Sequence, residues 1–120
     1  MSYIRGIRGA ISVSKNTKDE IISSAMTLLR EMAGLNKIKV EDIASVIFSV
    51  TKDLNAEFPA IAARKLGWKT TPLLCTYEVD VPGSLPKCIR VLMLVNSGKS
   101  QSSMKHVYLR NAKKLRPDLG

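Results

Sequence analysis

The sequence has few residues of the kinds that build metal sites or disulfide scaffolds. Its 120 residues include two cysteines, Cys75 and Cys88, and one histidine, His106. Two cysteines are too few for a disulfide scaffold, and their separation does not match the close spacing of a zinc-binding pair. A single histidine further weakens a metal-cluster interpretation. We therefore expect no metal and no cysteine framework.

Long apolar runs and recognisable targeting segments are also missing. The longest apolar run, 91–95, has the length of a strand, whereas a membrane span needs roughly 20 residues. The first six residues have neither the apolar core of a secretion signal nor the Ser- and Arg-rich character of a transit peptide. These absences predict a cytoplasmic protein with no membrane partner.

Glycine and proline are scarce, with 7 and 5 residues, while hydrophobic residues make up 45% and charged residues 24% of the chain. This composition is typical of a compact globular protein rather than a disordered or fibrous one. A chain of this length buries roughly two-thirds of its unfolded surface without disulfides or metal. We interpret residues 1–120 as one domain.

Acidic residues are outnumbered, since the chain has 19 Lys and Arg but only 10 Asp and Glu, which gives a net charge of +9. Such a protein attracts anions, which include nucleic acid, anionic lipid and small carboxylates or phosphates. Aromatic residues make up only 5% of the chain and do not interleave with basic runs, so recognition of nucleic acid by base stacking is poorly supported. Arg8 and Arg90 stand in apolar surroundings, where a guanidinium needs an anionic partner or a dense shell of hydrogen bonds.

The hydrophobic pattern predicts more strands than helices. The clearest element is a helix that begins at the capping box of Thr17 and Glu20 and continues at helical spacing to Gly34. Segment 88–96 is apolar on both faces except at Arg90 and is therefore expected at the centre of a sheet. The predicted elements are strand 3–13, helix 17–34, strand 44–51, helix 58–66, strand 70–81, strand 88–96, and a helical turn followed by a short strand within 105–115.

This order of elements favours an α+β fold, a mixed β-sheet covered by helices on one face. A single helix layer leaves the other face of the sheet in need of cover. For so small a chain, self-association in a cyclic oligomer is the economical way to provide that cover.

Six short segments, spread in order along nearly the whole chain, resemble the small monofunctional chorismate mutases of the AroH class. Any one of them could arise by chance, but six in order are specific. The segments are IRGIRGA (4–10), SVT (49–51) with DL (53–54), FPA (58–60), CIRV (88–91), HVYL (106–109) and LRPDL (115–119).

The resemblance implies a homotrimer arranged as a pseudo-α/β barrel, with an active site at each subunit interface. It also implies the reaction, a Claisen rearrangement of chorismate to prephenate in phenylalanine and tyrosine biosynthesis, and no cofactor. Such a rearrangement needs a dicarboxylate held in a compact chair and stabilisation of negative charge on the ether oxygen.

By the resemblance, five residues carry the chemistry. Arg90 is expected to donate to the ether oxygen and a nearby carboxylate, because arginine is always charged and bidentate toward carboxylates. Arg8 and Tyr108 are expected to bind a carboxylate, and the glycines beside Arg8 would let the substrate approach closely. Glu78 and Cys75 are expected to contact the ring hydroxyl.

Each of these residues also has an ordinary structural interpretation. Arg90 could pair with a structural carboxylate, and Arg8 could be a strand-surface arginine. Tyr108 could be half-buried with its hydroxyl satisfied, and Cys75 a small core hydrophobe. A nucleophilic pair of Cys75 and His106 is disfavoured because no third group that would orient it is evident.

Further residues are expected to bind the substrate rather than to act on it. By the resemblance, Arg64 and Arg116 lie near the more exposed ring carboxylate. Ile61 and Leu74 replace a lysine and a threonine of the family pattern, and the chain ends soon after its last matching segment, so we expect a less polar pocket rim with a reduced lid. The expected apolar walls are Phe58, Ala60, Leu73, Leu74 and Leu115.

Two functions of other classes stay open at this point. One is a non-catalytic trimeric protein that binds a small carboxylate without transforming it. The other is a nucleic-acid-binding domain, which the net charge of +9 motivates.

Overall fold

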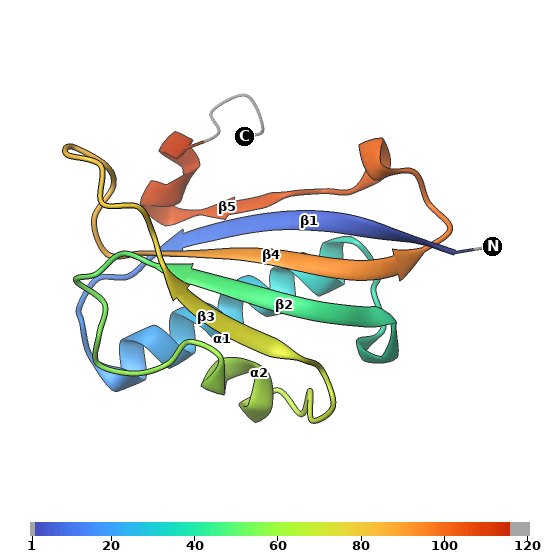
Figure 1. Ribbon diagram of the computed structural model, residues 1–120, viewed down its shortest axis with the longest axis horizontal. Coiled ribbons are helices and arrows are strands. Elements are labelled where there is room, and N and C mark those ends of the chain that lie inside the picture. Colours follow the sequence, from blue (N-terminus) through green and yellow to red (C-terminus); the bar gives the residue numbers. More distant parts are fainter. Residues whose placement is uncertain (1, 116–120) are drawn as a thin grey trace.

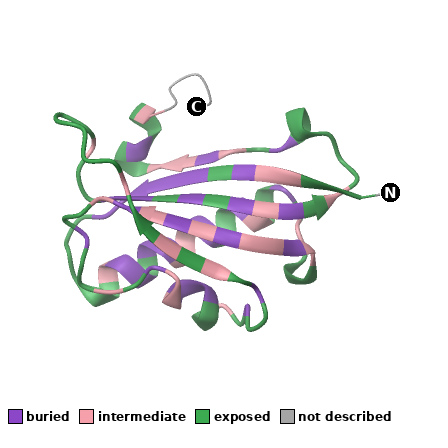
Figure 2. Ribbon diagram, viewed as in Figure 1, coloured by how far each residue is buried: buried purple, intermediate pink, exposed green. Residues whose placement is uncertain are grey.

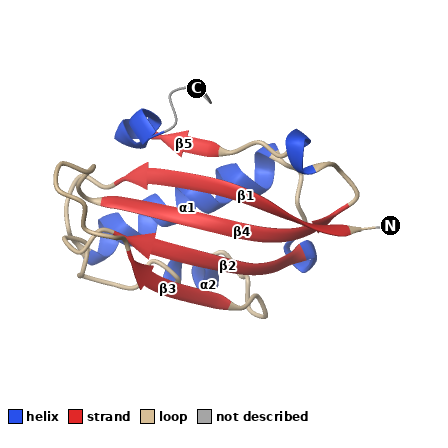
Figure 3. Ribbon diagram, turned by 45° about the horizontal axis from the view of Figure 1, so that its top comes forward, coloured by secondary structure: helices blue, strands red, loops and turns tan. Residues whose placement is uncertain are grey.

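The computed structural model describes residues 2–115 and contains a five-stranded mixed sheet with both α-helices on one of its faces (Figures 1 and 3). The strand order is β3-β2-β4-β1-β5. This arrangement confirms the α+β prediction. The elements are β1 (Tyr3–Ser12), α1 (Lys18–Leu35), β2 (Ile43–Val50), α2 (Ile61–Lys65), β3 (Leu73–Tyr77), β4 (Cys88–Ser97) and β5 (Val107–Leu109), with short 3-10 turns η1 (Val40–Asp42), η2 (Gln101–Ser103) and η3 (Arg110–Leu115).

The central position of β4 is confirmed, because β4 pairs antiparallel with both β1 and β2. The outer pairs, β1 with β5 and β2 with β3, are parallel. Strands β1, β2, β3 and β5 therefore all end where β4 begins. We call this side the carboxyl end of the sheet; in Figure 1 it lies at the left.

The core lies between the sheet and α1, as the alternation of side chains along the strands requires. Ile7 and Ile11 on β1 and Met93 on β4 are fully buried. Gly9 faces the same side, where a Cβ atom would lie 2.4 Å from Sδ of Met32. The expectation that this glycine admits substrate is therefore wrong, because Gly9 makes room for the helix on the face opposite Arg8.

Helix α1 begins as the capping box predicts. The hydroxyl of Thr17 accepts a hydrogen bond from the Glu20 amide at 3.2 Å. At the other end, Asn36 is buried and its side-chain amide donates to the carbonyls of Met32 and Lys105 at 2.8 and 2.9 Å. The Lys105 amide donates back to Asn36 at 2.7 Å. This exchange fixes the chain just ahead of β5.

The order of elements after residue 105 differs from the prediction. Strand β5 comes first and η3 follows, whereas a helical turn before the strand was expected. Arg110 ends the strand with a left-handed φ of 57°. Its guanidinium donates to the Ser12 carbonyl at 3.1 Å and to the buried Ser24 hydroxyl at 2.9 Å. Local periodicity could not reveal this order because pairing with β1 decides it.

Neither α1 nor α2 covers the second face of the sheet, which we call the open face (Figure 1). At the carboxyl end of this face, Ala112 of η3 packs with Ala10 and Cys88, and all three are buried. Alternation along β4 places Arg90, Leu92 and Leu94 on it, since Val91 and Met93 are buried on the helix side. Figure 2 shows buried and more exposed bands alternating along the strands. Leu92 is 38% exposed and Leu74 60%, so this face presents apolar side chains that a monomer leaves partly uncovered.

Candidate active site

Arg90 and Glu78 meet at the carboxyl end of the sheet. Arg90 is the third residue of β4 and lies on the open face. Glu78 directly follows β3, and its backbone amide donates to the Val50 carbonyl at 2.9 Å, which holds the chain in line with the sheet. Oε1 of Glu78 lies 3.6 Å from Nε of Arg90. The structure therefore pairs the arginine with a carboxylate that sequence reasoning had also placed in the site.

The pair lines a hollow of about 140 Å³. Small-molecule sites usually enclose roughly 300 Å³ or more, so this hollow is only part of a site for a ligand of that size. Its other walls come from the turn after β2, the loop between β3 and β4, and the start of β4. The lining residues are Thr51, Glu78, Val79, Val81, Ser84, Leu85, Cys88 and Arg90.

Tyr108 lies in the same row of the open face as Arg90. Ala10 on β1 is directly opposite Arg90 on one side and Tyr108 on the other. Strands lie about 4.8 Å apart, so the Cα atoms of Arg90 and Tyr108 are about 10 Å apart, with Ala10 between them in the sheet. Tyr108 and Leu115 pack against the buried Ala10 and Cys88. Ala10 is itself fully buried, in a cluster that also contains Ala112 of η3.

Arg8 occupies the next row of the open face, opposite Leu92, and is exposed. Its backbone amide donates to Nδ1 of His106 at 2.9 Å. Because Nδ1 accepts this bond, a neutral His106 carries its ring proton on Nε2. His106 lies just before β5, at the sheet edge opposite β3, so the structure does not bring it to Cys75 as a nucleophilic pair.

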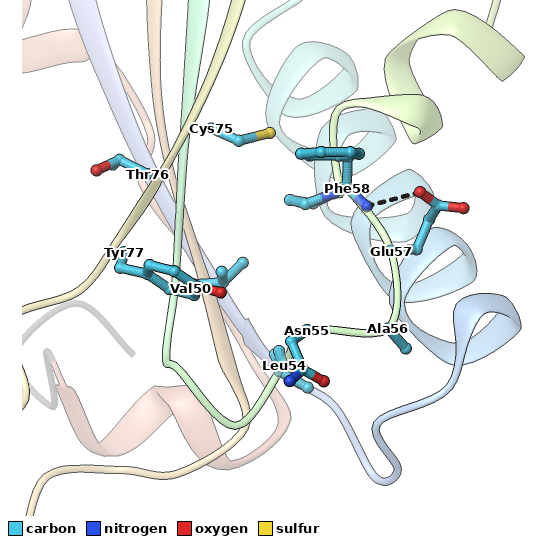
Figure 4. A pocket seen from close by; sticks show the side chains of 10 residues that line it. Val50, Leu54, Asn55, Ala56, Glu57, Phe58, Cys75, Thr76 and Tyr77 are labelled. Carbon is cyan, nitrogen blue, oxygen red and sulfur yellow. Dashed lines mark hydrogen bonds between the residues drawn. The ribbon is translucent and has the colours of Figure 1, made fainter.

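Cys75 belongs to a second hollow, of about 320 Å³, on the helix side of β3 (Figure 4). Figure 4 shows its thiol directed toward Phe58, while Thr76 points to the other side of the strand. Burial raises the pKa of the Cys75 thiol, and a hydrogen bond from the Ala60 amide opposes that rise. The group is therefore a neutral thiol near neutral pH, suited to hydrogen bonding or packing rather than to nucleophilic attack.

The remaining predicted residues surround this edge of the sheet. Leu73 packs against the helix-side core, and Leu74 points to the open face of the same strand. Arg64 on α2 donates to the backbone carbonyls of Trp68 and Lys69. Arg116 was also predicted for the site and lies outside the described residues.

The structure thus sorts the predicted residues into two groups on opposite faces of the sheet. Two members of the open-face group, Glu78 and Arg90, line the smaller hollow, which we call the Arg90 hollow. Two members of the edge group, Phe58 and Cys75, line the larger one, which we call the Phe58 hollow. The two hollows border the end of β3 from its two sides. The open-face group is Arg8, Glu78, Arg90, Tyr108 and Leu115, and the edge group is Phe58, Ala60, Arg64, Leu73 and Cys75.

Sequence reasoning assigns no functional role to three residues near Arg90. Cys88 is 1% exposed, and burial raises the pKa of its thiol to about 11. Thr51 and Asp53 hold the start of β4 through hydrogen bonds to Lys87 and Cys88. The sequence does contain a signal for Thr51 and Asp53. A Thr and an Asp two residues apart, directly after a strand, often form side-chain hydrogen bonds with nearby backbone groups.

Within 2–115, no three His, Cys, Asp or Glu side chains come together as a group that could hold a metal ion. None of the helices in that range combines the length and the apolar character that crossing a membrane requires.

An α+β sheet that presents two arginines, one carboxylate and a tyrosine on one open face is suited to binding a small anionic molecule. Comparison with known proteins makes the class specific. The family model described as chorismate mutase type I matches residues 4–119. The chain therefore belongs to the chorismate mutase type I family, and this membership assigns it the activity of an isomerase.

Individual relatives agree over nearly the whole chain. Chorismate mutase AroH of Thermus thermophilus is 51% identical over 117 residues, which are 97% of this chain and 96% of the relative. Chorismate mutase AroH of Bacillus subtilis (strain 168) is 46% identical over 97% of this chain and 92% of its own. The solved chorismate mutase from Clostridium thermocellum superposes with a TM-score of 0.90 at 58% identity and covers 91% of this chain and 97% of its own.

Proposed function

We propose that the protein converts chorismate to prephenate at sites formed between copies of the chain in a homotrimer. The reaction is intramolecular, since the ether C–O bond breaks while a new C–C bond forms in the same molecule. It needs no nucleophile, proton shuttle or redox partner. The protein has to hold the dicarboxylate in a chair and to stabilise the negative charge that develops on the ether oxygen.

The observation that carries this proposal is Arg90, held beside Glu78 on an open strand face with the methyl group of Ala10 next to it. A guanidinium offers five N–H donors, and the contact with Glu78 uses only one side of it. The others can reach the ether oxygen and the adjacent carboxylate of a substrate. Tyr108, across Ala10, supplies a hydroxyl donor for the same carboxylate.

Arg8 and Glu78 have complementary tasks in this scheme. Arg8 binds a substrate carboxylate from the neighbouring row of the open face. Glu78 accepts from the ring hydroxyl and limits the mutual repulsion of the arginines. Because all of these charges are in place before the substrate arrives, little reorganisation is needed when the ether bond breaks.

The assignment of the site to a subunit interface follows from the two groups of residues. One chain presents the open-face group and the edge group on opposite sides of its sheet, so both cannot surround the same ligand within that chain. The Arg90 hollow, of about 140 Å³, is also small for the substrate. An edge group from a second copy, with Phe58, Ala60 and Cys75, would complete it.

A closed ring of three copies fits the apolar character of the open face. Leu92 and Leu74 lie there, and a trimer with a pseudo-α/β barrel arrangement covers them with the equivalent faces of the other copies. Arg64 and Arg116 would contact the more exposed ring carboxylate, with Leu73 and Leu115 as further apolar walls. Ile61 and Leu74 make the rim less polar, so binding affinity is the property they are expected to affect.

The direct test is disappearance of chorismate with purified protein and no added cofactor, for the wild type and for Arg90→Ala. We expect the variant to fold and to lose at least about 100-fold in kcat, the usual cost of removing one preorganised donor. Near-normal kcat in Arg90→Ala would contradict the proposed role of Arg90. Binding of chorismate without product by the wild type would instead support the non-catalytic alternative.

The interface is tested by mixing two inactive variants. Arg90→Ala removes a residue of the open-face group, and Phe58→Asp places a negative charge in the edge group, where it repels the dicarboxylate. Refolded together, the two chains should recover activity, because random assembly leaves about one quarter of the interfacial sites with both groups intact. Recovery of no activity from well-formed mixed oligomers would place the site within one chain.

The cytoplasmic location stays a prediction. We propose it together with the function because the substrate and product are soluble metabolites that the enzyme must share with other enzymes. Fractionation of cells that express the chain tests it, and recovery of the protein with the membrane or outside the cell would contradict it.

A further inference from the structure

The turn after β2 is bonded to the first residues of β4. The Thr51 amide donates to the Cys88 carbonyl at 3.1 Å, and the Cys88 amide donates to the Thr51 hydroxyl at 3.0 Å. The Lys87 amide donates to both carboxylate oxygens of Asp53, at 3.1 and 3.0 Å. Arg90 follows this clamp by two residues.

The hydroxyl of Thr51 links the Asp53 carboxylate to the Cys88 amide. It has one proton, which it donates to Oδ1 of Asp53, and it offers a lone pair to the Cys88 amide. The carboxylate therefore orients the hydroxyl that in turn orients the strand. Asp53 acts on two successive amides, one directly and one through Thr51.

The backbone that Asp53 holds is not in a relaxed conformation. Lys87 has a φ of 47°, in the left-handed region that residues with a side chain seldom adopt. The Lys87 carbonyl also accepts from the Val13 amide at 2.7 Å, which ties the bend to the end of β1. The clamp thus stabilises a bend that turns the β3–β4 loop into β4 and sets where the strand begins.

We propose that Asp53 is a positioning residue for the reaction, one that fixes the start of β4 and so aims the Arg90 guanidinium beside Glu78. The inference rests on the role proposed for Arg90. Asp53 itself touches no reacting atom in this scheme. Its effect on catalysis passes through Thr51, Lys87 and the register of β4.

A positioning role predicts a particular split between kinetic constants. A misplaced Arg90 still attracts a carboxylate but stabilises the developing charge less well, so kcat falls and KM changes little. A role confined to stability would lower the melting temperature and the active fraction without changing kcat per folded site. The two roles are therefore separable by measurement.

The experiment compares Asp53→Asn, Thr51→Val and Thr51→Ser with the wild type. Asn keeps the size of the side chain but has one acceptor oxygen in place of two, and Val removes the hydroxyl while Ser restores it. We expect kcat to fall about 10- to 100-fold in Asp53→Asn and Thr51→Val, the cost of roughly 1 Å of misplacement, with KM within about threefold. Thr51→Ser should keep most of the wild-type kcat.

Lys52→Ala is the matched control, because Lys52 lies in the same turn and its exposed ion pair with Asp80, at 2.7 Å, leaves the clamp untouched. This variant should keep wild-type kcat. Amide NMR signals of Lys87 and Cys88 should move in Asp53→Asn and not in Lys52→Ala. In an Arg90→Lys background, Asp53→Asn should cost much less than it does alone, because the two substitutions affect one group.

Wild-type kcat in a folded Asp53→Asn would overturn the inference, as would a Thr51→Ser as slow as Thr51→Val. These failures are distinct from failure of the proposed function. If Arg90 variants lose turnover while Asp53→Asn does not, only the positioning role is wrong. If Arg90→Ala itself turns over normally, the proposed role of Arg90 is wrong whatever Asp53 does.

Discussion

Oε1 of Glu78 lies 3.6 Å from Nε of Arg90, a distance that makes an ion pair but exceeds that of a well-formed hydrogen bond. The two side chains come from strands that β2 separates, Glu78 from the end of the edge strand β3 and Arg90 from the central strand β4. The carboxylate is therefore near enough to offset the charge of the guanidinium and too far to occupy all of its donors.

Glu78→Gln tests what this carboxylate contributes. The amide keeps a hydrogen-bonding group of the same size but removes the charge beside Arg90. We expect kcat/KM for chorismate to fall by at least about 10-fold and the unfolding free energy to change by less than about 1 kcal/mol, because the pair is partly exposed. Asp80→Asn, two residues further along the chain, is the control and should behave as the wild type in both measurements.

The two thiols should differ in reactivity and in their effect on stability with pH. Burial raises the pKa of the Cys88 thiol from 9.0 to about 11, so the folded state keeps it neutral where the unfolded chain ionises it. Its contribution to stability is complete below about pH 9 and is lost as pH rises through about 11.

Chemical denaturation of the wild type and of Cys88→Ala measures this effect. The difference in unfolding free energy should shrink by about 1 to 2 kcal/mol between roughly pH 8 and pH 10.5. A thiol reagent should label Cys75 before Cys88, because Cys88 is the more deeply buried of the two. A difference that stays constant with pH would contradict the raised pKa.

Gly9→Ala should destabilise the fold through packing. The added Cβ would lie 2.4 Å from Sδ of Met32 and 3.1 Å from Cδ1 of Leu28, inside a fully buried contact between β1 and α1. We expect a loss of about 1 to 3 kcal/mol in unfolding free energy. Gly34→Ala is the control, since nothing lies within 4 Å of its Cβ position and alanine favours the helix, so it should raise stability by up to about 1 kcal/mol.

Leu92→Glu should prevent assembly if the open face is the subunit interface. The substitution places a charge on that face, two residues from Arg90, and sedimentation should show monomers with little turnover. Val40→Glu is the matched control, because Val40 is also 38% exposed but belongs to the turn before β2. A Leu92→Glu protein that stays trimeric would show that another surface makes the interface.

Much of the fold and the list of candidate residues could be predicted from the sequence. The capping box at Thr17, the central position of 88–96 and the α+β class are confirmed, because each depends on local spacing or on the period of apolar residues. The family was recognisable from short segments that the chain keeps in order, and the family comparison confirms it. The residues assigned to the site remain predictions that the proposed variants test.

The sequence by itself determined the class of fold, the family and the residue types that can bind a dicarboxylate, since these depend on composition and local order. Only the tertiary structure decided which of those residues lie together. Strand pairing puts Ala10 between Arg90 and Tyr108, sends Cys75 to the other face, and bonds Asp53 to Lys87 across 34 residues of chain. Such contacts arise from register and from the alternation of side chains across a sheet, and no local stretch of sequence specifies either.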